Sequence, residues 1–163
     1  GWLLSTGGVS VGVFEVGRGA LAGGGVAFVW VAMQPGKPQG AGRLADGTPI
    51  IALPGNPVSS FVSFEVFVRP VIRRLAGASN VTRRRLKARL EIEMTSPAAR
   101  EQYARVTLSW PDGVPVATPV GGRGSHLMGA LASADGLAVI PAEVTEVAAG
   151  TMVEVIDLRE DAR

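Results

Sequence analysis

The sequence of 163 residues contains no cysteine and only one histidine, His126. Without cysteine there are no disulfides, thiolate metal sites or cysteine nucleophiles, and a zinc site would lack its usual ligands. No apolar run reaches membrane-spanning length, and no signal-peptide pattern opens the chain. We therefore expect no membrane span, and the missing cysteines fit a cytoplasmic protein.

Charge is sparse as well. Charged residues make up 18% of the chain, hydrophobic residues 47%, and the formal net charge is +2, a composition typical of a globular protein. One basic cluster stands out, Arg83–Arg85 together with Lys87. No aromatic residues interleave with it, so a solvated linker is favoured over a nucleic-acid site.

The first half of the chain alternates predicted strands and helices. We expect a helix at 13–22 and a second one after Pro57, kinked at Pro70 and ended by Gly77. The proline- and glycine-rich stretch Gln34–Gly42 is predicted to be a loop. This pattern indicates an α/β fold with a parallel sheet. Its strands are expected at Leu3–Thr6, Val26–Met33 and Thr48–Pro54.

From about Arg84 the pattern changes to period-2 alternation. The segment RLKARLEIEM is followed by several more short runs of β-forming residues, separated by turn signals such as Pro111-Asp112-Gly113. At most one short helix, near 125–132, interrupts them. The sequence therefore predicts two domains, 1–78 with an α/β fold and 84–163 with a small β-barrel.

Two glycine-containing segments follow predicted strands. In STGGVSVG, Gly7 and Gly8 either allow a tight turn for steric reasons or present backbone N–H groups, with the Ser10 hydroxyl, to a phosphate. In LPGNPVSS, Asn56 and Pro57 are explained in part as the cap and first residue of a helix. The preceding Pro54-Gly55 adds rigidity that a simple connection does not need, which favours a binding loop.

Two charged residues lie near these segments. Lys37, in the proline-stiffened QPGKP, either is a solvated surface cation or faces the sheet edge where an oxyanion would sit. Glu15 either is a solvated carboxylate or carries Mg²⁺ through its oxygens. The residues alone leave both alternatives open.

Four stretches, taken together and in this order, resemble the molybdopterin molybdenumtransferase family, to which the gephyrin E domain also belongs. They are TGGVSVG, VAMQPGKPQGAGRL, LPGNPVSSFVSFEVFVRP and GSH. The resemblance implies insertion of molybdate into the dithiolene of adenylylated molybdopterin, with Mg²⁺ and release of AMP. It also implies the C-terminal half of a molybdopterin-binding parallel-sheet domain followed by a β-barrel domain, in a homodimer. Further domains would precede Gly1, so the segment alone is expected to be inactive.

The resemblance assigns roles to individual positions. Glu15 and Lys37 would be catalytic, and Glu15, where the family usually has an aspartate, would bind the metal. The residues implied to line the molybdopterin pocket are Gly7, Gly8, Ser10, Gly55, Asn56, Pro57 and, from the barrel, Ser125.

Departures from the family pattern leave alternatives open. Gln34 and Val31 stand where lysines are common, and Val13 where an acidic residue is common. Lys37 is therefore the one cation of its loop. The alternatives are a molybdopterin adenylyltransferase, which would lack the second domain, and a catalytically weak scaffold of the same fold.

Overall fold

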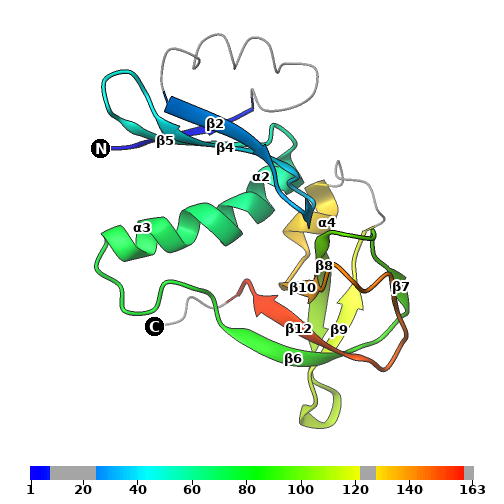
Figure 1. Cartoon of the computed structure of the whole chain (residues 1–163). Coiled ribbons are helices and arrows are strands. Elements are labelled where there is room, and N and C mark those ends of the chain that lie inside the picture. Colours follow the sequence, from blue (N-terminus) through cyan, green and yellow to red (C-terminus); the bar gives the residue numbers. More distant parts are fainter. Residues whose placement is uncertain (8–24, 122–127, 160–163) are drawn as a thin grey trace.

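The fold was obtained as a computed structural model, which describes residues 1–7, 25–121 and 128–159 (Figure 1). The predicted helix at 13–22 lies outside this range. So do several predicted site residues, namely Gly8, Ser10, Glu15 and Ser125.

The first half forms a four-stranded sheet in the order β1-β5-β4-β2. Its central strands, β5 (Pro49–Leu53) and β4 (Pro38–Arg43), are antiparallel to each other, and β4 is also antiparallel to β2 (Gly25–Trp30). β1 (Leu3–Thr6) runs parallel to β5. The sheet is therefore mixed, and among its described strands the expected parallel pairing is found only between β1 and β5.

The prediction that Gln34–Gly42 is a loop was wrong, because most of this segment belongs to β4. Pro38 is the first residue of the strand, where a missing N–H is tolerated. A Cβ built on Gly42 would lie 2.0 Å from the carbonyl oxygen of Gly25 on β2. Gly42 thus allows the two strands to approach closely. The proline- and glycine-rich composition of the segment was mistaken for that of a turn.

The helix predicted after Pro57 is present in three consecutive parts: α2 (Pro57–Ser63), a π-helical segment (Phe64–Val68) and α3 (Arg69–Leu75). The Arg69 N–H donates to the Phe64 carbonyl, five residues back. Pro70 follows directly and has no N–H, and its ring needs room near the preceding turn. The expected irregularity at Pro70 thus takes the form of a widened helical turn.

The helix ends as the sequence predicted. Gly77 has a φ of 78°, and its N–H donates to the Arg74 carbonyl. The Ala78 N–H donates to the Arg73 carbonyl. These two hydrogen bonds form a Schellman motif with glycine at its left-handed position.

The second half is a closed five-stranded barrel, which confirms the predicted β-barrel. Around the barrel β6 pairs with β9, β9 with β8, β8 with β10, β10 with β12, and β12 again with β6. The bounds are β6 (Arg85–Leu90), β8 (Glu101–Ser109), β9 (Val116–Pro119), β10 (Gly136–Ile140) and β12 (Met152–Asp157).

Shorter elements lie between the strands of the barrel in the sequence. β7 (Met94–Thr95) pairs with β11 (Glu146–Val147) as a separate small sheet. A 3₁₀ turn covers Pro111–Gly113, and α4 spans Met128–Ala132, within the region where one short helix was expected.

The two halves of the chain meet through a short strand. β3 (Met33–Gln34) pairs in parallel with the start of β8 and so extends the barrel sheet. A small core at this junction draws on both halves: Met33, Val62, Tyr103, Leu137 and Ile156. The barrel also keeps a larger core of its own. The division of the chain into two domains, 1–78 and 84–163, stays a prediction. The two parts contact each other through β3 and this small core.

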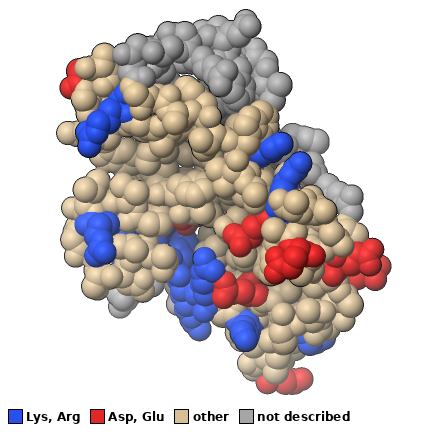
Figure 2. Space-filling model, in the orientation of Figure 1, with Lys and Arg blue, Asp and Glu red and all other residues tan. Residues whose placement is uncertain are grey.

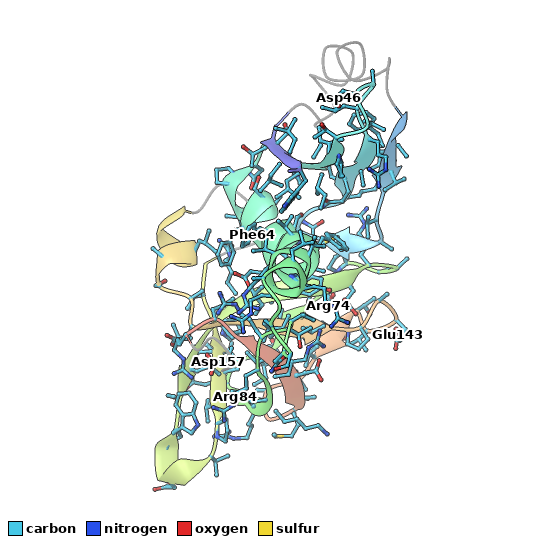
Figure 3. The ribbon with its side chains drawn as sticks, turned by 90° about the vertical axis from the view of Figure 1, so that its left-hand side faces the viewer. Asp46, Phe64, Arg74, Arg84, Glu143 and Asp157 are labelled. Atoms are coloured by element: carbon cyan, nitrogen blue, oxygen red, sulfur yellow. The ribbon has the colours of Figure 1, made fainter. Side chains whose placement is uncertain are left out.

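The long helix formed by α2, the π-helical segment and α3 lies between the four-stranded sheet and the barrel, as Figures 1 and 3 show from two sides.

A buried carboxylate, Glu65, holds this helix against the barrel half. Both of its oxygens accept hydrogen bonds from Arg83, at 2.6 and 3.0 Å. Arg83 also donates to the Leu158 carbonyl at the end of the barrel, at 3.1 Å. The linker arginine thereby joins the helix to the last strand.

We expect Glu65→Gln to lower the free energy of unfolding by about 3–5 kcal/mol, because it removes the counter-charge of Arg83 and of the buried Arg69, whose Nε lies 3.8 Å from Glu65 Oε2. The side chain of Glu65 is 4% exposed. The matched control is Glu154→Gln, which removes the exposed partner of Arg85. That change should cost less than about 1 kcal/mol. Urea denaturation of both variants measures the difference, and equal losses would contradict the role given to Glu65.

Candidate functional site

A cleft of about 790 Å³ opens where β3 and α2 meet the barrel. Gln34, Pro35 and Val58 line it from the first half of the chain. The other lining residues come from the barrel half, including the central part of β8. The cleft therefore depends on both halves. Over the face shown in Figure 2, side chains of both charges gather on the barrel, whereas the upper sheet carries few.

Arg105, on β8, is the one arginine or lysine among the described residues that line this cleft. Burial lowers the pKa of its guanidinium, which nevertheless stays charged in proteins. A partly desolvated guanidinium in a cleft attracts an anion more strongly than an exposed one does. Sequence reasoning missed Arg105. The available signal was an arginine inside the apolar strand pattern QYARVTL.

Tyr103 lies two residues away on the same face of β8 and reaches both the cleft and the junction core. Its hydroxyl donates a hydrogen bond to the Glu101 carboxylate. Burial raises the pKa of the Tyr103 phenol, and the bond and negative charge of Glu101 raise it further. Tyr103 therefore stays protonated at neutral pH and serves as a donor.

The loop after β3 is fixed to the helix. Gln39 donates through Nε2 to the Gly36 carbonyl and to the Ser63 hydroxyl, both at 2.6 Å. Gly36 has a φ of 105°, and a Cβ there would lie 2.7 Å from Ser63 Oγ. These contacts give the loop a defined position. The sequence analysis did not predict this role for Gln39 or Ser63.

Lys37, the predicted catalytic cation, belongs to this loop but is not among the residues that line the cleft. Its ammonium lies 4.3 Å from the centre of the Trp30 ring, a cation–π distance. Gln34 and Pro35, at the start of the same loop, do line the cleft. The catalytic role of Lys37 stays a prediction.

The two glycine-containing segments lie next to each other. Gly7 has a φ of 91°, and its N–H donates to the Leu53 carbonyl at 3.1 Å. A Cβ on Gly55 would lie 3.3 Å from the Cα of Gly7. Both segments follow the carboxyl ends of the parallel strands β1 and β5, where ligands of α/β sheets commonly bind.

Asn56 and Pro57 begin α2. The side-chain oxygen of Asn56 accepts hydrogen bonds from the Val58 and Ser59 N–H groups, at 3.1 and 3.2 Å. Pro57 occupies the first helical turn. Their structural explanation as cap and first residue is confirmed, and a binding role stays a prediction. Val58, which lines the cleft, places this helix start beside it.

Metal binding was predicted at Glu15, outside the described residues. Within residues 1–7, 25–121 and 128–159, no group of three or more histidine, aspartate or glutamate residues is placed to hold a metal ion. None of the helices in these ranges is both long and apolar enough to span a membrane.

Comparison with known proteins gives two family matches. Residues 2–74 match the family described as a probable molybdopterin binding domain. Residues 87–158 match the MoeA C-terminal region (domain IV). The chain belongs to the molybdopterin molybdenumtransferase family. The resemblance seen in the sequence is thereby confirmed.

Individual relatives agree. The chain is 48% identical over 163 residues to molybdopterin molybdenumtransferase 2 of Mycobacterium tuberculosis, covering 96% of this chain and 40% of the relative. It is 39% identical to molybdopterin molybdenumtransferase 1 of that organism, covering 97% and 39%. A crystal structure of the molybdopterin biosynthesis MoeA protein from Pyrococcus horikosii superposes with a TM-score of 0.75 at 28% identity, over 98% of this chain and 38% of that one. The chain thus spans about 40% of the length of its relatives.

Asn56→Ala should lower the free energy of unfolding by about 1 kcal/mol, because two helix N–H groups lose their acceptor. The matched control is Asn80→Ala. Asn80 is exposed and uses its backbone carbonyl to accept from Arg73, so its side chain should matter little. Urea denaturation of both variants decides. An Asn56→Ala variant as stable as wild type would show that the cap contributes nothing.

Proposed function

We propose that the cleft is where molybdate is inserted into the dithiolene of adenylylated molybdopterin, with release of AMP. One observation carries this proposal: the cleft lies between the region that matches a molybdopterin-binding domain and the region that matches MoeA domain IV. Residues from both regions line it, so a substrate bound there would contact both.

The proposed oxyanion ligand is Arg105. Molybdate is a small tetrahedral dianion, and a guanidinium offers it several N–H donors in one plane. Glu93 and Glu146 also line the cleft, but both are exposed, so water screens their repulsion.

Lys37 is the proposed second cation. Its aromatic contact is with Trp30, which is 54% exposed. An exposed cation–π contact is worth only about 0.5–1 kcal/mol. Lys37 does not line the cleft, so its ammonium would leave Trp30 to contact a dianion bound there, and the interaction it gives up is weak.

The phosphate end of molybdopterin is assigned to the glycine-containing segments. A Cβ on Gly55 would lie 3.3 Å from the Cα of Gly7, and Gly7 itself has a positive φ of 91° that favours glycine. Gly55 and Pro57 are exposed. With Gly8 and Ser10, they would present backbone N–H groups and one hydroxyl to a phosphate. Ser125 would contribute from the barrel half.

Mg²⁺ is proposed as the metal, with Glu15 as its ligand. The described residues supply no alternative carboxylate cluster for it. When bound, the metal would neutralise phosphate charge. The catalytic role proposed for Glu15 depends on this binding.

The β-barrel weighs against the adenylyltransferase alternative, because an adenylyltransferase was expected to lack a second domain.

A homodimer and a cytoplasmic location remain part of the proposal. Sedimentation of the complete protein should give the mass of two chains, and a monomer at all concentrations would remove the dimer from it.

Lys37→Ala and Arg105→Met should each impair molybdenum insertion roughly ten- to a hundredfold at limiting molybdate, the effect of one lost charge-assisted contact. High molybdate should restore part of the loss, since the contact is to the oxyanion. The assay is cofactor formation over a molybdate titration in the complete protein.

The control for this pair is Lys87→Ala, which removes an exposed lysine of β6. It should leave the titration unchanged, and thermal melts should show all three variants folded. Unchanged turnover in both Lys37→Ala and Arg105→Met would place the molybdate site elsewhere.

A further inference from the structure

A smaller recess of about 260 Å³ opens beside the cleft, around the paired ends of β3 and β8. It shares three lining residues with the cleft, Gln34, Thr95 and Gln102. Ser96, Pro97 and Arg100 complete it. The recess and the cleft are therefore adjacent.

Two residues that line the recess each have a buried side-chain oxygen without a hydrogen-bond partner among the described residues, Ser96 Oγ and Gln102 Oε1. Ser96 is only 8% exposed. A buried polar atom left unpaired is rare in folded proteins, since it loses water and gains nothing in return. Two such atoms beside one recess would be satisfied by a ligand whose polar groups reach them.

The backbone holds both residues in place. Gln102 is part of β8, paired with Gln34 of β3 and with Ile140 of β10. The Ser96 N–H donates to the Thr145 carbonyl at 2.8 Å. Neither residue can therefore satisfy its side chain by moving its backbone without breaking other hydrogen bonds.

A guanidinium lies at the same place. Arg100 Nη1 is 3.4 Å from Gln34 Oε1, at the long limit of a hydrogen bond. A guanidinium carries five N–H donors in one plane. The recess thus combines a cation, a serine hydroxyl and a glutamine amide.

These groups fit a heteroaromatic ring better than a bare oxyanion. A glutamine amide offers one acceptor and one donor side by side, and pairs with a ring edge that carries the complementary pair, as glutamine does with adenine. An oxyanion without protons offers nothing to Gln102 Oε1. The volume corresponds to roughly eight or nine water molecules, which is more than one oxyanion needs.

We propose that the recess binds the pyrimidinone edge of a pterin. Gln102 pairs with the ring N–H and carbonyl at positions 3 and 4, while Ser96 and Arg100 donate to neighbouring ring acceptors. The inference rests on the proposed function, which supplies molybdopterin as substrate. It adds a place for the ring at the barrel side, whereas the phosphate is assigned to the glycine segments.

The test uses the intrinsic fluorescence of two small probes, 6-hydroxymethylpterin and its 3-methyl derivative, titrated with the complete protein. Wild type should bind the unmethylated pterin roughly tenfold more tightly, because methylation removes the N–H that Gln102 accepts. Gln102→Met keeps the side-chain length but loses the amide. It should bind both probes equally and weakly, and Ser96→Ala should weaken both.

Lys87→Met, on the outside of β6, is the control and should keep the wild-type preference. The comparison of the two probes on wild type needs no variant, so it decides even if Gln102→Met does not fold. Equal binding of both probes by wild type, or pterin binding by folded Gln102→Met at wild-type strength, would overturn the subsite and leave a water-filled recess.

The outcome is separable from that of the proposed function. Failure of molybdenum insertion by wild type, with the probe preference intact, would overturn the proposed function alone. Normal insertion without any probe preference would overturn the subsite alone.

Discussion

The cleft depends on the pairing of two residues, Met33 and Gln34, with the first residues of β8. Met33 is 2% exposed and anchors the junction core, while Gln34 lines both the cleft and the recess. The loop that follows is then tied to the helix by Gln39. Glu65 and Arg83 make the second connection between the halves, at the far end of the barrel. With the helix held on both sides, the walls of the cleft have fixed positions.

Much of the fold was predictable because its signals are local. The apolar spacing after Pro57, the glycine at position 77 and the period-2 strands from Arg84 each depend on a few neighbouring residues. β4 was missed because prolines and glycines usually indicate a turn, whereas here Gly42 permits strand contact. The pairing of β3 with β8 was missed because a two-residue strand has no periodicity, and its partner is remote in sequence.

The candidate site divides in the same way. Gly7 and Gly55 follow strands of a predicted parallel sheet, whose carboxyl ends share one edge, and the structure places them next to each other. Arg105 and Gln102 were missed because polar residues within a strand are mostly exposed to water. They line a cleft and a recess only because β3 and α2 cover this part of the barrel. No pattern within β8 itself contains that information.

A site built at a junction suits a substrate whose two ends differ in chemistry. Glycine segments at strand ends provide backbone N–H groups for phosphate, but they carry no side chains that distinguish one ring from another. Strand β8 provides such side chains, Gln102 and Arg105, and its pairing with β3 and β10 holds its backbone in place. If molybdopterin binds as proposed, its phosphate contacts the first half of the chain and its ring contacts the barrel half. The pairing of β3 with β8 then sets the distance between the phosphate site and the ring site.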